Sequence, residues 1–354
     1  MNNVNLKHLY RMTDGFGILE HCLFSIPDVK EGYCVDDNAR ALMVALRYKE
    51  SELVDIYLKF LVLASSEDGF RNDVTKDIVW DKVLNGENFG RAMAALAETG
   101  IMAKLENQRL AGIFLFDKLS FLINKIESNR AKAWLIYGLY LRTKINKKLD
   151  QKIENYAKVK IAQNKIKKFE KQNLKLLIKL ISDELVVEYN KNKDKNWNWF
   201  EDKITYDNGR IPWGLFYAFK ILGDKQILKI AEESLDFLTE KIFDSRNDYF
   251  SFPGCNGWLT KTNKAKFGQQ PIEVGSMVEV YVLAYEITEN KRYKELAKKV
   301  YDWFEGKNVL GAKMTDVKTG GIYDGLEKEG VNLNQGAESL LAYLFAVKEM
   351  EKLD

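Results

Sequence analysis

The sequence predicts an all-α protein, an (α/α)6 toroid in which six helical hairpins form a ring. Several segments are apolar almost all round, as expected of buried helices. Other segments have an apolar stripe with helical periodicity and a charged opposite face, which is typical of surface helices. A similar polar turn precedes each of six buried segments, which indicates a repeat of six hairpins. We expect residues 1–354 to form one domain, with residues 1–30 as the segment that closes the ring.

The segments that are apolar almost all round are predicted to be the inner helices of the ring. Pro212 and Pro271 each stand near the start of one of them, where a helix tolerates proline. The six segments lie at residues 41–47, 92–97, 134–141, 213–219, 277–285 and 340–347.

The amphipathic segments at residues 226–238 and 293–304 are predicted to be outer helices, with one face in water. The apolar stripe of the second ends with Trp303 and Phe304. A short polar turn, such as residues 223–225, joins each inner helix to its outer helix. Longer loops rich in Gly, Asn and aromatic residues lead to the next inner helix.

The polar turns before the inner helices are similar to one another, since five of the six contain Asn and four contain Arg. They lie at residues 36–40, 87–91, 128–130, 207–210, 269–271 and 334–336. Inner helices of a toroid run in the same direction, so these turns should meet at one face, with the positive ends of the helix dipoles. Asp, Asn and Ser are also ordinary helix caps. Capping does not account for the paired acids and paired glutamines, so we expect a binding site there.

Aromatic residues stand beside acids and amides in the loops that lead to these turns. The loop at residues 196–207 (NWNWFEDKITYD) is the most marked example. Aromatic rings can stack on the apolar faces of sugars while carboxylates and amides bind hydroxyl groups, so this composition favours a saccharide site. The expected substrate-binding residues are Tyr33, Asn38, Arg40, Trp80, Asn88, Arg91, Trp199, Asn208, Arg210, Trp258, Gln269, Gln270, Asn334 and Gln335.

Glycoside cleavage requires one carboxylic acid and one carboxylate, which acts as base or nucleophile. Asp37 and Asp207 stand at helix N-termini, where the charged form suits a base. Glu273 and Glu338 lie one short turn into buried helices, where a raised pKa suits an acid. The candidate catalytic residues are Asp36, Asp37, Asp202, Asp207, Glu273 and Glu338, with Glu87 as a further acid at the second turn.

The composition excludes several other classes of protein. The formal charge of +3 is too balanced to predict a nucleic-acid partner. The chain has three scattered cysteines and two histidines, His8 and His21, so we expect no metal site and no cofactor. No apolar run is long enough to predict a membrane span, and no signal-peptide core is present, so we expect a cytoplasmic protein.

Four blocks resemble a six-hairpin (α/α)6 glycosidase-like family whose members occur alone or fused to glycosyltransferases. They are residues 32–40 (GYCVDDNAR), 199–210 (WFEDKITYDNGR), 267–273 (FGQQPIE) and 332–339 (NLNQGAES), and residues 10–27 resemble the start of the same family. The resemblance implies the toroid fold, a role in glycan metabolism and a possible glycosyltransferase partner. The tandem Asp36-Asp37 is also similar to the paired aspartates of some (α/α)6 endo-mannanases, which implies a mannose-containing substrate.

We therefore predict a glycoside hydrolase that acts on an oligosaccharide or polysaccharide by a two-carboxylate mechanism. Two alternatives remain open: a non-catalytic glycan-binding module that serves a glycosyltransferase, and an inverting phosphorylase whose Arg40, Arg91 and Arg210 bind phosphate. Sugar 2-epimerases share the ring architecture, but their chemistry uses histidines within the barrel. His8 and His21 both precede the first inner helix, so we discount an epimerase.

Overall fold

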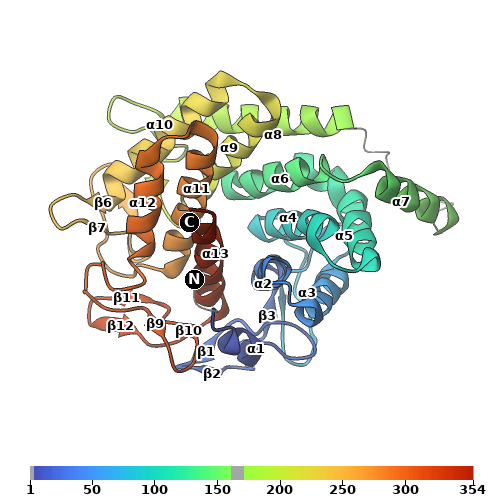
Figure 1. The fold of residues 1–354 in the computed structure, drawn as a ribbon, viewed down its shortest axis with the longest axis horizontal. Helices are drawn as coiled ribbons and strands as arrows, with labels where there is room; N and C mark the ends of the chain where they lie inside the picture. The colour runs from blue at the N-terminus through green and yellow to red at the C-terminus, as the bar shows by residue number, and fades with distance from the viewer. Residues whose placement is uncertain (1–3, 161–170, 354) are drawn as a thin grey trace.

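The computed structural model describes residues 4–160 and 171–353. Residues 1–3, 161–170 and 354 of the expected single domain lie outside this description. The described chain is a ring of paired helices, which confirms the predicted (α/α)6 toroid (Figure 1).

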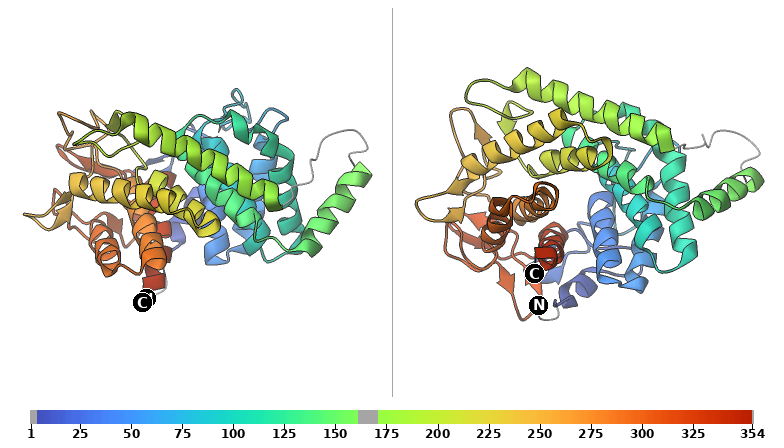
Figure 2. Two further views of the ribbon diagram at one scale, coloured as in Figure 1. Left: turned by 90° about the horizontal axis from the view of Figure 1, so that it is seen from above. Right: turned by 45° about the horizontal axis from the view of Figure 1, so that its top comes forward.

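Six inner helices close into a complete ring. Each packs against the next along the chain, and α13 packs against α2, so no gap is left between the last helix and the first (Figures 1 and 2). The inner helices are α2 (Val35–Tyr48), α4 (Glu87–Met102), α6 (Asn129–Arg142), α9 (Arg210–Leu222), α11 (Pro271–Thr288) and α13 (Ala337–Met350).

An outer helix packs against each inner helix: α3 on α2, α5 on α4, α8 on α6, α10 on α9, α12 on α11, and the short N-terminal α1 on α13. The extra helix α7 packs against α5 (Figure 1). The outer helices are α1 (Lys7–Met12), α3 (Ser51–Ala64), α5 (Glu106–Leu119), α7 (Lys147–Lys160), α8 (Lys171–Asn192), α10 (Lys225–Ile242) and α12 (Lys291–Tyr301), with 3-10 helices η1 (Ser120–Lys125) and η2 (Glu351–Leu353).

The turn between α9 and α10 shows how the sequence ends one helix and begins the next. Gly223 takes a left-handed conformation with φ 69°, which ends α9 at little steric cost. Asp224 then caps α10, because its side chain accepts a hydrogen bond of 2.9 Å from the amide of Gln226. The prediction for α12 was too long, since this helix ends at Tyr301 and Trp303 is buried in the turn that follows.

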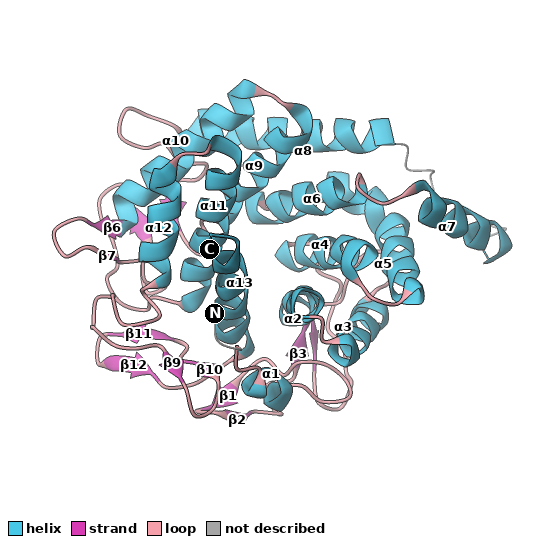
Figure 3. Ribbon diagram, in the orientation of Figure 1, coloured by secondary structure: helices cyan, strands magenta, loops and turns pink. Residues whose placement is uncertain are grey.

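Short antiparallel strand pairs lie in the loops, along the bottom and the left of the ring in the view of Figure 3. They pair as β1 with β2, β3 with β4, β5 with β8, β6 with β7, β9 with β10, and β11 with β12. Their bounds are β1 (Cys22–Leu23), β2 (Ile26–Pro27), β3 (Tyr33–Cys34), β4 (Asp73–Val74), β5 (Lys203–Ile204), β6 (Phe243–Asp244), β7 (Tyr249–Phe250), β8 (Leu259–Thr260), β9 (Thr315–Asp316), β10 (Gly321–Ile322), β11 (Gly325–Glu327) and β12 (Gly330–Asn332).

A buried ion cluster fills the middle of the ring. The guanidinium of Arg47 lies 2.8 Å from Glu98, 3.4 Å from Glu279 and 3.5 Å from Glu349. Arg210 reaches the same cluster, with Nη2 at 2.6 Å from Glu279. These residues come from five inner helices, so the cluster joins them. No helix that the structure describes is long and apolar enough to cross a membrane.

Candidate active site

A polar pocket lies where the N-terminal ends of inner helices meet. Its volume is about 450 Å³, and it opens to solvent. The starts of α2, α4 and α13, the residue before α11, the segment before β1 and the loop around β11 and β12 all contribute to its wall. The lining residues are Glu20, His21, Cys34, Asp36, Asp37, Arg40, Asn72, Arg91, Tyr206, Cys255, Gln270, Asp324, Glu327, Asn332, Asn334, Gly336, Glu338 and Ser339.

The first turn of α2 brings the predicted tandem acids into the pocket. The thiol of Cys34 caps the helix, since it accepts a hydrogen bond of 3.4 Å from the amide of Asp37. One turn later, Arg40 donates to Asp37 at 2.8 Å and also pairs with Glu338 of α13 at 2.9 Å. Arg40 therefore joins the acids of two helix starts.

Arg91 joins the turns before three inner helices. Its guanidinium is buried and lies 2.6 Å from Asp36, 3.0 Å from Glu87 and 3.4 Å from Asp207. Arg91 lines the pocket, as does Arg40, but the hydrogen bonds of both side chains are largely taken up by carboxylates. Both guanidinium groups therefore have little capacity left for an additional anion.

Glu20 lies in the pocket wall, although the sequence did not single it out. Its amide donates to the carbonyl of Gly32 at 3.1 Å, and its carbonyl accepts from the amide of Ala337 at 3.0 Å. Gly336 permits this contact, because a Cβ there would stand 3.2 Å from the Glu20 carbonyl oxygen. The loop that carries Glu20 is thus fastened to the start of α13.

The carboxyl group of Glu20 holds its proton at neutral pH. Its pKa is raised to about 8, mainly by burial and also by the neighbouring Asp37, Asp73 and Asp36 carboxylates. Its oxygen lies 3.6 Å from Nε2 of His21, which is exposed on the same wall. A carboxylic acid that keeps its proton in an open pocket has the property required of a general acid.

Glu338 also has a raised pKa. Burial is the main cause; Arg40 opposes it, and Asp37 adds to it. The side chain keeps 39% of its surface exposed and lines the pocket. Glu338 is the second residue of α13, so it stands within the first turn of this buried helix and not one turn into it as predicted. Unlike Glu20, it is paired with the guanidinium of Arg40.

Asp207, Asn208 and Glu273 form a buried cluster that does not line the pocket. Glu273 accepts hydrogen bonds from the amide of Asp207 at 2.5 Å and from Nδ2 of Asn208 at 2.9 Å. Burial raises the pKa of Glu273 to about 8. Asp207 has φ 46°, a left-handed conformation that costs energy, and the contacts with Glu273 hold this turn in place. The cluster supports the start of α9, and the structure places its carboxyl groups away from solvent.

Arg210 is likewise a buried scaffold residue. Its guanidinium stacks on the rings of Trp134 and Trp213, with centroids at 4.0 and 4.5 Å, and donates to Glu279 at 2.6 Å. It does not line the polar pocket. It lines a small buried cavity together with Arg40 and Asp207, and both Arg210 and Arg91 approach Asp207, so a carboxylate occupies the place between these arginines.

The predicted aromatic residues contribute little to the pocket wall. Trp199 is fully buried, so no face is free for a sugar. Trp80 packs against Phe60 at 5.4 Å, outside the lining. Tyr206 lines the pocket, and Trp258 lies behind it with the two ring centroids 6.3 Å apart. Tyr206 therefore supplies an aromatic ring to the pocket wall, although it is not among the substrate-binding residues predicted from the sequence.

Most of the predicted amides hold the scaffold together. Asn38, for example, accepts from the amide of Ile18 at 3.0 Å and donates to the carbonyl of Cys34 at 2.9 Å. The buried amides with such bonds are Asn38, Asn88, Asn208, Gln269 and Gln335. The structure places Gln270 and Asn334 in the pocket wall.

Two further predicted residues lie outside the pocket. The hydroxyl of Tyr33 donates to Asp14 at 2.5 Å and is buried beneath the N-terminal segment. Asp202 is exposed in the loop after α8 and lines no part of the pocket.

The two histidines have different positions. His8 is buried, and its Nε2 lies 2.8 Å from the carbonyl oxygen of Gln335. His21 lines the pocket together with Glu20 and Asp324. Burial raises the pKa of Asp324, and His21 is one of the groups that oppose this shift. The argument that neither histidine reaches the barrel is therefore wrong for His21, because the N-terminal segment folds back over the start of α13.

One group of three residues in the described chain could hold a cation: Glu20, Cys34 and Asp37, whose ligand atoms lie within 4.8 Å of one another. Cys34 is buried, and burial raises the pKa of its thiol. A protonated thiol and a protonated Glu20 are poor ligands, so this donor set does not favour a metal ion.

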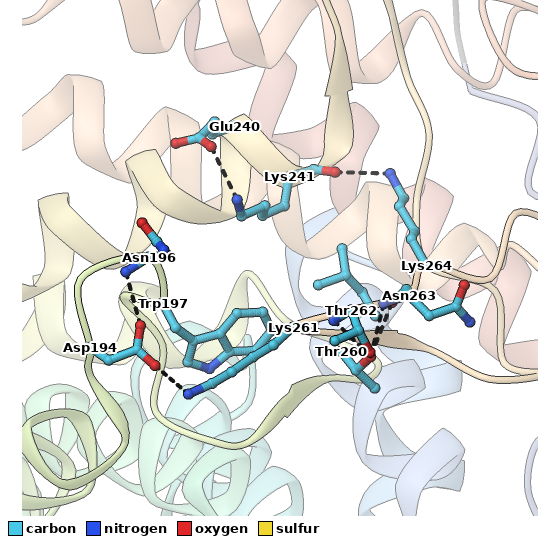
Figure 4. Close-up of a pocket in the computed structure, with 11 residues that line it drawn as sticks. Asp194, Asn196, Trp197, Glu240, Lys241, Thr260, Lys261, Thr262, Asn263 and Lys264 are labelled. Atoms are coloured by element: carbon cyan, nitrogen blue, oxygen red, sulfur yellow. Dashed lines mark hydrogen bonds and ion pairs between the residues drawn. The ribbon is translucent and has the colours of Figure 1, made fainter.

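A second, larger depression of about 560 Å³ lies away from the helix starts, between the loop after α8, the end of α10 and the loop around β8 (Figure 4). Its charged groups pair with one another, as Asp194 does with Lys261 and Glu240 with Lys241. Lys264 donates to the carbonyl of Lys241 at 2.9 Å. The side chains are engaged in local contacts and do not converge on a reacting group.

Comparisons with known proteins identify the fold. No protein-family model matches the chain, and no curated protein sequence matches it. Among solved structures, a sugar epimerase from a ruminal bacterium is similar with a TM-score of 0.67 at 14% identity, over 98% of this chain and 94% of that chain. The cellobiose 2-epimerase of Bacillus thermoamylovorans B4167 gives 0.66 at 13% identity, over 98% and 95%.

A GH76 α-mannanase of Bacteroides thetaiotaomicron is similar with a TM-score of 0.55 at 11% identity, over 91% of this chain and 87% of that chain. At such identities the likeness concerns the fold. The closed ring of six inner helices and these structural neighbours together show that the described chain has the (α/α)6 toroid fold.

Proposed function

We propose that the chain is a carbohydrate-active enzyme, a glycoside hydrolase that cleaves an oligosaccharide or polysaccharide in the polar pocket. One observation carries this proposal: Glu20 keeps its proton at neutral pH beside the ion-paired Asp36 and Asp37. Glycoside cleavage uses such a combination, because the leaving oxygen needs a proton and the oxocarbenium-like centre needs a carboxylate.

The proposed roles follow from exposure and ion pairing. Glu20 protonates the glycosidic oxygen. Asp36, with a side chain 25% exposed and fixed by Arg91, acts on the anomeric carbon directly or through water. Asp37 lies within 4.8 Å of Glu20, which is short of the roughly 6.5–9.5 Å of an inverting enzyme and near the roughly 5–5.5 Å of a retaining one. Its side chain is only 4% exposed and is paired with Arg40, however, so we do not assign it the role of nucleophile. Its negative charge instead helps Glu20 to retain the proton.

The charge of the pocket favours an uncharged sugar. Six carboxyl groups line it (Glu20, Asp36, Asp37, Asp324, Glu327 and Glu338), against the guanidinium groups of Arg40 and Arg91. With Glu20 protonated, the other five carboxyl groups still outnumber the two guanidinium groups. This excess of acids disfavours phosphate and uronic acids, which argues against the phosphorylase alternative. A neutral hexose such as mannose fits this charge, and the fold likeness to an α-mannanase supports it.

A sugar epimerase or isomerase is the second candidate. His21 beside Glu20 supplies two titratable groups on one wall, which could move a proton at a carbon next to a carbonyl. The fold likeness to a sugar epimerase and to D-mannose isomerase also supports this candidate.

A non-catalytic glycan-binding module that serves a glycosyltransferase is the third. A module of this kind would need the hydroxyl-binding groups of the pocket, but it would not need a carboxylic acid with a raised pKa.

The experiment is to incubate the protein with manno-, gluco- and galacto-oligosaccharides, and with the free sugars, in D2O with and without phosphate. Mass spectrometry then distinguishes the candidates. Shortened chains support a hydrolase, and sugar phosphates formed only with phosphate support a phosphorylase. Deuterium on carbon without cleavage supports an epimerase or isomerase. Binding without any product, measured by calorimetry, would overturn the enzymatic proposal.

A further inference from the structure

An exposed apolar hairpin stands beside the mouth of the pocket. It consists of β1, β2 and the turn between them, where Leu23, Phe24 and Ile26 are 63%, 58% and 64% exposed. We infer that Phe24 is the stacking platform of an additional sugar subsite, which takes a unit of an oligosaccharide that extends out of the pocket. This inference rests on the proposed function, because it assigns a subsite to the same glycan.

Hydrogen bonds fix Phe24 to the wall of the pocket. Its amide donates to Oδ1 of Asn334 at 2.9 Å, and its carbonyl accepts from the amide of Gln335 at 2.9 Å. Asn334 itself lines the pocket, and so does His21 three residues before Phe24. The phenylalanine is therefore held at a defined place next to the cavity.

The backbone of Phe24 indicates that this aromatic side chain serves something other than packing. Its φ is 54°, a left-handed conformation in which glycine or asparagine is usual and a bulky residue is strained. The hairpin turn would form more readily with glycine or asparagine at this position. Burial does not compensate the strain, since more than half of the side chain is in water.

The phenyl ring of Phe24 complements the polar groups of the pocket. Its wall is rich in carboxylates and amides that bind hydroxyl groups, with Tyr206 as the lining phenol ring. A sugar also has an apolar face, which an aromatic ring can cover. Phe24, flanked by Leu23 and Ile26, offers this apolar surface at the rim.

The hairpin is continuous with the pocket through the backbone of residues 20–24 and through Asn334, which is why we assign it to the glycan that the pocket binds. A docking surface for a partner protein would not need to be connected to the pocket wall in this way. Association with a second copy of the chain is the outcome that the test below must separate.

The test compares the wild-type protein with Phe24→Ala, Phe24→Trp and the control Phe121→Ala. Phe121 is 57% exposed in η1 and lines no part of the pocket. Phe121→Ala therefore removes a similarly exposed aromatic ring at another place on the surface. Calorimetry measures binding of mannobiose, mannopentaose, cellobiose and cellopentaose to each protein. Light scattering measures the mass of each protein in solution.

We expect Phe24→Ala to weaken binding of a pentaose about three- to tenfold, the effect of one lost aromatic contact, and to leave the biose unchanged. Phe24→Trp should restore the pentaose affinity, and Phe121→Ala should match the wild type. Equal pentaose affinity in wild type and Phe24→Ala would overturn the subsite alone. A mass that falls from dimer to monomer in Phe24→Ala would also overturn it, in favour of self-association. Absence of binding by all four sugars would overturn the subsite together with the proposed function.

Discussion

Replacing Glu20 by glutamine should make the protein more stable at high pH. The folded pKa of Glu20 is about 8 against an ordinary value of 4.5, so the native state binds this proton more tightly than the unfolded chain does. The Glu20 carboxyl group therefore stabilises the fold least at a pH where it is ionised in both the folded and the unfolded chain. Wild-type stability should fall, relative to Glu20→Gln, as pH rises from about 4.5 to about 8, and the difference should be complete above pH 8.

The size of the effect follows from the shift. Each pKa unit corresponds to about 1.4 kcal/mol, so the full shift sets an upper limit of about 5 kcal/mol. The Glu20 side chain keeps 30% of its surface exposed, and water screens part of the cost. We expect Glu20→Gln to gain about 2–3 kcal/mol over the wild type between pH 5 and pH 9.

Urea unfolding at intervals of half a pH unit measures this difference directly, without knowledge of the substrate. Glutamine is nearly isosteric with the protonated acid, so the two proteins should have similar stability at pH 4.5. The matched control is Asp202→Asn, in which an exposed carboxylate is removed and no pH-dependent difference is expected. A constant offset between Glu20→Gln and wild type across the whole range would refute the assignment of a raised pKa to Glu20.

Three further predictions concern the pocket. Arg91→Met should cost about 3 kcal/mol in urea unfolding, because it leaves Asp36, Glu87 and Asp207 without their shared cation; a loss under 1 kcal/mol would mean that the acids repack without it. Asp202→Asn should leave turnover within twofold of wild type, since Asp202 lies outside the pocket, and a large loss would return it to the catalytic candidates. Gly336→Ala should lower activity much more than the melting temperature, because its Cβ would stand 3.2 Å from the Glu20 carbonyl and displace that loop; equal activity would show that the loop adapts.

The sequence predicts the ring well because the pattern of each helix is local. The largely apolar inner helices, the amphipathic outer helices and the capped turn at Asp224 depend on residues within a few positions of one another. The convergence of Asp36, Asp37 and Glu338 follows from the same pattern, since parallel inner helices place their N-terminal ends at one face.

What the sequence does not predict depends on contacts between distant segments. Glu20 and His21 reach the pocket because their loop pairs with the start of α13, more than 300 residues away, and no short pattern records this contact. The composition of the loop around Trp199 resembles a sugar-binding loop, yet tertiary packing buries the ring completely. Exposure, which separates a stacking aromatic from a packing aromatic, is a property of the folded chain.

The role of Glu20 as proton donor is the central claim, and leaving-group dependence tests it most directly. A 2,4-dinitrophenyl glycoside of the sugar that the wild type cleaves needs no protonation of its leaving group, whereas the natural glycan does. Glu20→Gln should lose about 10²–10⁴-fold in kcat/KM on the glycan and stay within about fivefold of wild type on the aryl glycoside. Equal losses on both substrates, or no loss on the glycan, would contradict the claim and move the acid role to Glu338.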